Sequence, residues 1–176
     1  MPKTGKRFTR AEAEKRIKPV IEMLEKGGFK YEICGSWRRK KEDVGDIDIL
    51  VEKGSGKYLD LSKFNLDWAG EDKVGFEIDK MHVDIKFVPK ESWGAGLLHH
   101  TGPYGFNIKL RSMAKRKGWL LNEYGLFDRK TGEVVAQKTE KEILEALMNK
   151  ESATRLLKPE NRKTPDWVKK IWGKVK

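Results

Sequence analysis

Apolar residues in the first part of the chain recur first at helical spacing and then at strand spacing. Thr9 and Glu12 have the pattern of a capping box, and apolar residues follow every three or four positions, so we expect a helix over 9–26. Alternating apolar and polar positions then predict strands. These strands are expected at 29–34, 46–52, 74–79 and 81–88, with a tight turn at Asp79 and Lys80 between the last two.

The second part of the chain mixes shorter helices and strands. Helical spacing predicts three helices, and the third begins with a second capping box, Thr139 and Glu142. The helices are expected at 91–99, 103–117 and 139–149, and short strands at 119–122, 124–128 and 133–136. After these elements, Pro159 and Pro165 indicate a loosely structured tail, although the helical spacing of Trp167 and Val168 with Ile171 and Trp172 could form a terminal helical turn.

Charge changes this picture, because the chain is strongly basic. It has 38 Lys and Arg against 27 Asp and Glu, a net charge of +11. Such an excess indicates a polyanionic partner, most simply nucleic acid, although a well-solvated basic surface is the alternative. Five basic residues and no acid lie between residues 105 and 121, and the tail from Lys150 has nine basic residues against three acids. Trp167 and Trp172 in this tail either pack on the body or touch DNA.

Composition excludes several classes of protein. A length of 176 residues suits one domain or two small subdomains. No apolar run approaches the roughly 20 residues that span a bilayer, and no apolar segment follows the basic N-terminus as in a secretory signal. The single cysteine, Cys34, excludes an internal disulfide and a zinc-finger spacing. We therefore expect an intracellular protein that does not contact a membrane.

Two aspartates, Asp46 and Asp48, lie one residue apart inside an apolar run. In a strand they share one face, where two carboxylates repel unless a cation neutralises them. Asp84 is a third acid, on the polar face of a strand that could lie beside the first. A lone acid on such a face is often only solvated, but three carboxylates on neighbouring strands can hold two hard metal ions, Mg²⁺ or Mn²⁺.

A glycine-serine turn precedes these acids. Gly35 allows a close backbone approach, and the Ser36 hydroxyl with backbone N–H groups can bind phosphate oxygens. The planar guanidinium of Arg39 can reach the same phosphates, and Arg7 or Arg10 is a further candidate for a phosphate contact. Such a turn is common alone, but followed by Gly45 and the two acids it indicates a metal-dependent enzyme that acts on nucleotides.

The motifs resemble those of the family X DNA polymerases, the family of DNA polymerase beta. The resemblance is carried by CGSWRR, GDIDILV, VDIKFVPKESWGAGLLHHTGPYGFN and RSMAKRKGWLLNEYGLF, in family order over residues 9–143. The first two motifs alone would also fit poly(A), CCA-adding and antibiotic-modifying transferases. The later motifs are similar to family X alone.

This resemblance implies an α+β fold and assigns roles to residues. It implies a palm with a mixed or antiparallel sheet and flanking helices over 1–98, followed by a small α+β subdomain that binds nucleotide and DNA over 99–176. The implied catalytic residues and metal ligands are Asp46, Asp48 and Asp84. The implied nucleotide-binding residues are Gly35, Ser36, Arg39, Gly45, His99, His100, Gly102 and Asn107, and the implied DNA- or template-binding residues are Lys109, Arg111 and Lys115.

The chain departs from the family pattern at several places. His99 and His100 stand where the family commonly has an aromatic pair, which leaves the choice between deoxyribose and ribose open. His82 stands where an arginine often precedes the third acid by two residues. Because the first helix begins at Thr9, we also expect no helical lyase subdomain before the palm, as in small viral members of the family.

The combined expectation is a template-directed DNA polymerase. It would add deoxynucleotides to a primer 3′-hydroxyl with two Mg²⁺ or Mn²⁺ ions, as a monomer that fills short gaps in repair. Its partners would be gapped or primer–template DNA and deoxynucleoside triphosphates. Two alternatives stay open at this point: a terminal transferase that needs no template or accepts ribonucleotides, and a non-catalytic nucleic-acid-binding module.

Overall fold

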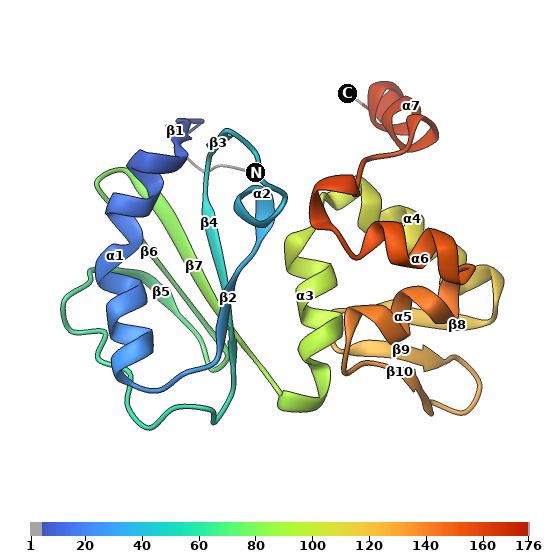
Figure 1. Ribbon diagram of the computed structural model, residues 1–176, viewed down its shortest axis with the longest axis horizontal. Coiled ribbons are helices and arrows are strands. Elements are labelled where there is room, and N and C mark those ends of the chain that lie inside the picture. Colours follow the sequence, from blue (N-terminus) through green and yellow to red (C-terminus); the bar gives the residue numbers. More distant parts are fainter. Residues whose placement is uncertain (1–4, 176) are drawn as a thin grey trace. The chain divides into compact units, whose positions relative to one another are not determined.

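The chain divides into two compact units, Met1–Lys90 and Glu91–Lys176, each with its own hydrophobic core (Figure 1). The computed structural model describes residues 5–175, with side chains up to residue 171. The subdomain boundary expected after residue 98 falls inside a helix of the second unit, α3 (Trp93–Thr101).

The first unit is a mixed sheet with one long helix on it (Figure 1). Its strands run in the order β2-β4-β7-β6-β5, and β4 and β7 are the parallel pair among antiparallel neighbours. Strands β1 and β3 form a separate two-stranded ribbon. The elements are β1 (Phe8–Thr9), α1 (Arg10–Lys26), β2 (Tyr31–Ile33), α2 (Gly35–Arg38), β3 (Asp43–Val44), β4 (Ile47–Glu52), β5 (Leu66–Ala69), β6 (Lys73–Ile78) and β7 (Met81–Val88).

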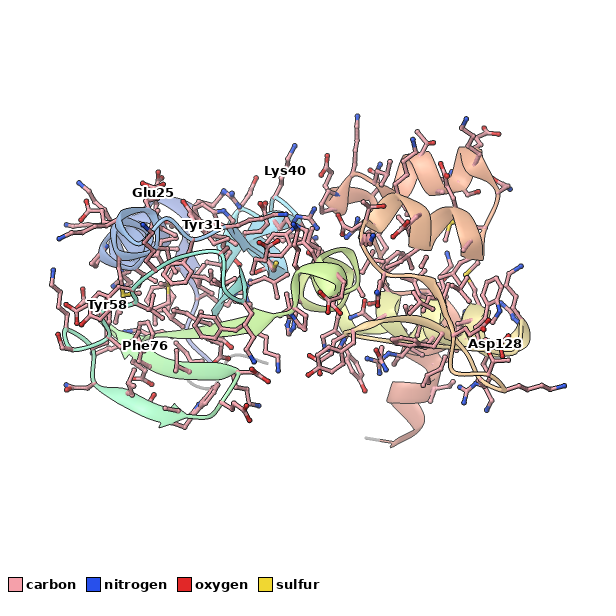
Figure 2. The ribbon with its side chains drawn as sticks, turned by 90° about the horizontal axis from the view of Figure 1, so that it is seen from below. Glu25, Tyr31, Lys40, Tyr58, Phe76 and Asp128 are labelled. Atoms are coloured by element: carbon pink, nitrogen blue, oxygen red, sulfur yellow. The ribbon has the colours of Figure 1, made fainter. Side chains whose placement is uncertain are left out.

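Helix α1 begins and ends as its sequence predicts. Thr9 is the N-cap, with its side chain accepting from the backbone N–H of Glu12 in a complete capping box, and Gly27 is the C-cap. The buried stripe of α1 packs against the sheet residues that point away from the acids. This stripe consists of Ala13, Ile17, Val20 and Leu24. Tyr31 of β2 donates a 2.8 Å hydrogen bond to Glu25 of α1 (Figure 2).

The predicted strands of this unit are confirmed, with small changes at their ends. The strand expected from residue 46 begins at Ile47, so Asp46 lies just before it. The turn between β6 and β7 consists of Asp79 and Lys80, both with positive φ (46° and 70°). Strand β5 was not predicted, because it is an edge strand whose residues are mostly exposed and carry no alternating pattern.

In its described residues, the second unit contains five α-helices and a three-stranded antiparallel sheet, in the order β10-β9-β8. The sheet and every one of these helices except the last contribute residues to a core of the unit's own. Its helix 103–117 begins one residue later than expected, since Pro103 is the N-cap. The elements are η1 (Lys90–Ser92), α3, α4 (Tyr104–Arg116), β8 (Trp119–Asn122), β9 (Gly125–Asp128), β10 (Val134–Ala136), α5 (Glu140–Leu147), α6 (Lys150–Leu156), η2 (Pro159–Asn161) and α7 (Asp166–Val175).

The prediction of a loosely structured tail was wrong. Asn149 caps α6 by accepting from the backbone N–H of Ser152 at 2.8 Å. Beyond η2, the guanidinium of Arg162 is buried and donates to Glu140 at 2.8 Å and to the carbonyl of Leu156 at 2.9 Å. These contacts join residues far apart in sequence, which explains why local composition did not reveal the ordered tail.

The mixed sheet of the first unit and the helices and sheet of the second confirm the predicted α+β fold class. Among the described residues, no helix combines the length and the apolar character needed to cross a bilayer.

Candidate active site

Strands β4 and β7 bring two of the predicted acids together. The strands are parallel neighbours, and Asp48 pairs in register with Asp84. Residues in register on adjacent strands share a face about 4.8 Å apart. On the opposite face, Ile49 and Ile85 are also in register and are buried in the core under α1. The sheet therefore fixes both carboxylates on its polar side, where both are half-buried.

The turn after β2 approaches Asp48 closely. The backbone N–H of Cys34 donates to the carbonyl of Asp48 at 2.7 Å. Gly35 follows with a φ of 62°, and a Cβ at this position would lie 3.2 Å from Oδ2 of Asp48. Glycine thus satisfies two demands here: a left-handed backbone and the space next to a carboxylate.

The phosphate-binding candidates lie on and just after α2. Ser36 is half-buried in the first turn of this short helix, and Arg39 is its C-cap. Burial lowers the pKa of the Arg39 guanidinium, and the negative charge of Asp48 opposes this shift. Because an arginine pKa starts far above neutrality, Arg39 stays charged and adds a cation close to the acids.

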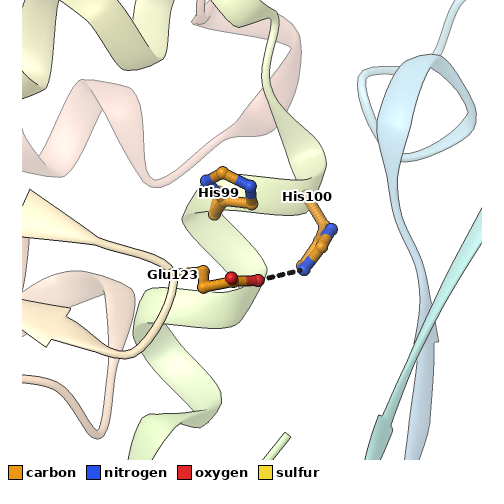
Figure 3. Close-up of side chains that lie close together, drawn as sticks. All are labelled: His99, His100 and Glu123. Carbon is orange, nitrogen blue, oxygen red and sulfur yellow. Dashed lines mark ion pairs between the residues drawn. The ribbon is translucent and has the colours of Figure 1, made fainter. Parts of the chain in front are cut away.

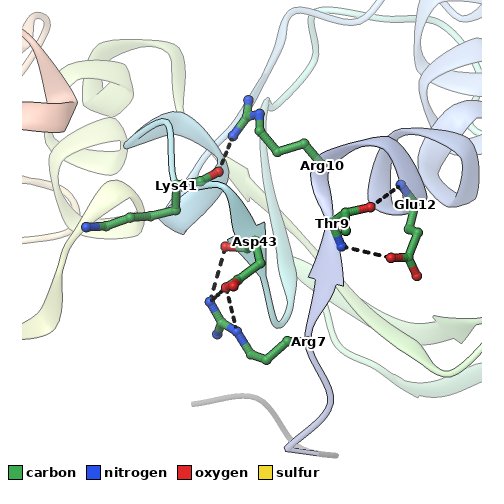
Figure 4. A network of polar contacts seen from close by, with 6 residues as sticks. All are labelled: Arg7, Thr9, Arg10, Glu12, Lys41 and Asp43. Atoms are coloured by element: carbon green, nitrogen blue, oxygen red, sulfur yellow. Dashed lines mark hydrogen bonds and ion pairs between the residues drawn. The ribbon is translucent and has the colours of Figure 1, made fainter.

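The segment between α2 and β4 is held by the N-terminal residues (Figure 4). Arg7 donates from Nε to Asp43 at 2.9 Å. Arg10 donates to the carbonyls of Trp37 and Lys41 at 3.1 and 3.0 Å, and its guanidinium lies 4.0 Å from the Trp37 ring centroid. Both arginines were expected as candidates for phosphate contacts, but here they make structural contacts. These contacts hold the segment that leads into the buried Gly45 and into Asp46.

His82 is the direct neighbour of the third acid. Its side chain is 1% exposed, and its Nε2 lies 2.8 Å from Oδ1 of Asp84. Its Nδ1 faces Oδ2 of Asp67 at 3.9 Å. The histidine at the position where an arginine was expected therefore still contacts the carboxylate, and it fixes the orientation of Asp84.

The donor set fits hard divalent cations. Asp46, Asp48 and Asp84 offer carboxylate oxygens, which Mg²⁺ and Mn²⁺ prefer, and the latter two are fixed on adjacent strands. Asp46 lies just before β4, two residues before Asp48, and is half-buried like it. These residues could therefore hold divalent metal at this end of the parallel strand pair.

The second unit places its candidate residues at the end of α3 (Figure 3). The rings of His99 and His100 meet edge to face with centroids 4.8 Å apart. Nε2 of His100 lies 3.6 Å from Oε2 of Glu123 in the β8–β9 turn. The guanidinium of Arg111 lies within hydrogen-bonding distance of Nδ1 of His99, at 3.1 Å.

The turn between α3 and α4 is fixed from both sides. Asn107, largely buried on α4, donates from Nδ2 to the carbonyl of His99 at 2.8 Å. Gly102, the C-cap of α3, has a φ of 65°. His99, Asn107 and Arg111 also line one small pocket of this unit. The structure thus brings together three of the residues for which the sequence predicted contacts with nucleotide or template.

The predicted DNA-binding residues of α4 do not share one face. Lys109 and Arg111 are two residues apart, so they point to different sides of the helix. Arg111 points toward His99, whereas Lys109 lines a groove with Trp167 of α7. Lys115, four residues after Arg111, is exposed.

Sequence reasoning missed Glu123 and Asp67. Each lies beside a histidine that was singled out, His100 and His82 respectively, but is distant from it in sequence. Glu123 stands between Leu121 and Gly125 of a motif used for the family resemblance, and this position was the available signal. Asp67 lies on the unpredicted strand β5, so no sequence pattern placed it near β7.

Family models match both units. A model of the DNA polymerase beta palm matches residues 7–90, and a model of the DNA polymerase beta thumb matches residues 96–162. The palm match covers the three predicted acids, and the thumb match begins inside α3, continues through η2 and ends before α7.

Curated relatives agree with these matches. A Bacillus subtilis protein named DNA polymerase/3'-5' exonuclease PolX is 32% identical over 125 residues, which are 65% of this chain and 22% of that protein. The chain therefore spans about a fifth of the bacterial relative. Proteins named Repair DNA polymerase X from African swine fever virus isolates are 30–31% identical over 127 residues, 64% of this chain and 72% of each viral protein. The predicted resemblance is confirmed, and the chain belongs to family X of the DNA-directed DNA polymerases, the family of DNA polymerase beta.

Proposed function

We propose that the chain is a template-directed DNA polymerase that fills short gaps during repair, using two divalent metal ions. The observation that carries this proposal is the register of Asp48 and Asp84 on adjacent parallel strands, beside a glycine turn with Ser36 and Arg39. The names of the viral relatives, which include repair, support the biological setting. The net charge of +11 supports a nucleic-acid substrate.

The three acids would hold the metal, and His82 would keep Asp84 in place. When bound, two divalent ions supply activation of the primer hydroxyl and neutralisation of charge on the triphosphate. Asp84 presents its carboxylate toward the reacting side of the sheet because His82 binds its Oδ1 at 2.8 Å. A carboxylate oriented in this way is suited to hold the proton that leaves the primer hydroxyl.

The remaining residues bind and orient. The Ser36 hydroxyl, the neighbouring backbone N–H groups and Arg39 bind phosphate oxygens, while Gly35 and Gly45 allow close backbone approach. In the thumb unit, we propose that His99, His100, Gly102 and Asn107 contact the sugar and base of the incoming nucleotide. Hydrogen bonds of His99 with Asn107 and with Arg111 fix the shape of that surface before the nucleotide arrives, which lowers the entropy cost of binding.

Primer extension on a duplex with a one-nucleotide gap tests this proposal. We expect the chain to insert the complementary deoxynucleotide with Mg²⁺, and Asp84→Ala to abolish insertion while gapped-DNA binding changes less than about threefold. Loss of activity should exceed about a thousandfold, because the variant loses a group required in every turnover. Glu71→Gln, which removes an exposed acid of the same unit, is the matched control and should extend normally.

The same assay separates the alternatives. Near-normal insertion by Asp84→Ala would refute the role of the acid. Equal insertion of all four deoxynucleotides regardless of the template would show a terminal transferase, and preference for ribonucleotides would overturn the assigned substrate.

A further inference from the structure

A groove on the thumb unit lies between α4 and α7, outside the predicted nucleotide site. It has a volume of about 470 Å³. It is lined by Lys109, Ser112, Met113 and Arg116 of α4 and by Trp167 of α7. The family match to the thumb ends at residue 162, so the aromatic wall of the groove comes from a segment beyond it.

The connection to α7 is anchored to the unit body. The buried ion pair of Arg162 with Glu140 holds the chain just before the helix. Thr164 then packs on Gly105 of α4 so closely that a Cβ on this glycine would lie 2.2 Å from the Thr164 methyl carbon. Two residues therefore fix the path of the chain on α4 before α7 begins.

Trp167 stays exposed although its neighbours are fixed. Val168 is 1% exposed and anchors α7, whereas the Trp167 side chain is 44% exposed. The backbone N–H of Val168 donates to Pro165 at 3.1 Å, which fixes the first turn of the helix. An indole that is half-exposed on a fixed backbone can stack on a ligand at low entropy cost.

The groove wall on α4 is cationic. Lys109, Ser112, Met113 and Arg116 follow the spacing of one helical stripe, so the two cations lie about 10 Å apart along the helix. No acid is among the residues that line the groove in the described part of the chain. On α7, the exposed Lys169 and Lys170 outnumber the one exposed acid, Asp166, so the charge near Trp167 is also net positive.

We propose that this groove binds single-stranded nucleic acid, with one base stacked on Trp167 and the flanking phosphates on Lys109 and Arg116. A cationic groove with an exposed aromatic side chain is the arrangement that binds unpaired strands, because every unpaired base offers a ring face and every nucleotide a phosphate. Duplex DNA offers phosphates alone, since its bases are already stacked on one another. The occupant is therefore a single-stranded segment, such as the template strand where it is unpaired. This inference uses nucleic acid as the ligand but does not require the proposed chemistry.

Measurements of nucleic-acid binding in the absence of catalysis test the proposed role of the groove. Fluorescence anisotropy of a labelled oligothymidylate and of a blunt duplex of equal length, in the absence of metal and nucleotide, gives both affinities. We expect Trp167→Ala to weaken single-strand binding between about fivefold and a hundredfold and duplex binding by less than twofold. Trp167→Phe, which keeps a ring, should restore most of the affinity. Ile171→Ala, 51% exposed on the same helix, is the matched control and should bind as the parent chain does.

Salt dependence tests the two cations. Lys109→Gln and Arg116→Gln should each lower the slope of log affinity against log salt by about 0.7 on the single strand.

Equal loss of duplex and single-strand binding in Trp167→Ala would overturn the proposal, as would full displacement of the oligonucleotide by polyglutamate at matched ionic strength. Dimerisation that disappears in Trp167→Ala would instead show a second copy as the occupant. None of these binding measurements depends on primer extension. A negative result would therefore overturn the groove proposal, while the polymerase proposal is tested separately by primer extension.

Discussion

Replacement of Gly35 by alanine tests whether the turn after β2 positions a catalytic acid. Gly35 has a φ of 62°, where an alanine costs about 1–2 kcal/mol of folding free energy. Gly28 has a similar φ of 76°, and a Cβ there would have no heavy atom within 4 Å. Gly28→Ala therefore carries the same backbone cost without a new contact.

The two variants differ in what the added methyl group meets. At Gly35 the Cβ would lie 3.2 Å from Oδ2 of Asp48, so the carboxylate must move by a few tenths of an ångström. A displacement of 1 Å at a reacting group costs about a hundredfold in rate, so this smaller shift should cost about fivefold to tenfold. The expected result is similar destabilisation of both variants but loss of activity in Gly35→Ala alone.

Urea denaturation gives the two stabilities, and gap filling at 25 °C gives kcat and the Mg²⁺ concentration for half-maximal rate. Gly35→Ala should lower kcat and require more Mg²⁺, because Asp48 is displaced from its position, while Gly28→Ala should change neither. Equal activity of the two variants at saturating Mg²⁺ would refute the argument that Gly35 is required by Asp48.

Three further predictions concern stability. Glu140→Gln should lower the free energy of unfolding by about 3–5 kcal/mol in urea, because it leaves the charge of Arg162 buried without its carboxylate. Gly94→Ala should cost more than about 2 kcal/mol, since its Cβ would lie 2.3 Å from the backbone of Thr139 and the two helices would have to separate. Asp128→Ala should destabilise the chain at neutral pH but less in acid. Hydrogen bonds from the backbone N–H groups of Thr131 and Lys130 lower the pKa of Asp128 in the folded chain. The stabilisation by this carboxylate is therefore present above the unfolded pKa of about 3.9 and is lost as the pH falls through the lower folded pKa.

Each of these has its own check. The double variant Glu140→Leu with Arg162→Met should be more stable than Glu140→Gln, and additive losses would contradict a coupled pair. Gly70→Ala, with no atom closer than 3.8 Å to its Cβ, is the mild counterpart of Gly94→Ala. A pH-independent loss in Asp128→Ala would show that its carboxylate charge contributes nothing.

The sequence predicted those parts of the fold that depend on local pattern. The capping boxes at Thr9 and Thr139 place the starts of α1 and α5, because each is complete within four residues. The alternation around Asp48 and Asp84 predicted two strands with acids on one face. The burial of the alternate apolar residues of both strands in the core confirms this prediction.

The parts that were missed depend on contacts between distant segments. Strand β5 forms because its neighbour β6 offers an open edge, and this places Asp67 near His82. The tail is ordered because Arg162 finds Glu140, and the sequence shows only a basic residue in a polar run. Neither pairing leaves a periodic signal, so neither could be predicted from the hydrophobic pattern.

The parallel register of Asp48 and Asp84 also has a consequence for folding. Their strands are adjacent in space, but β5 and β6 lie between them in sequence, so the pairing closes a long loop. Contacts of high sequence separation form slowly, since the loop entropy is lost before the pairing stabilises the chain. A segment that holds Asp48 and Asp84 in register must therefore include the whole chain from β4 to β7. During refolding from urea, catalytic competence should therefore return later than most of the chain's helical circular dichroism.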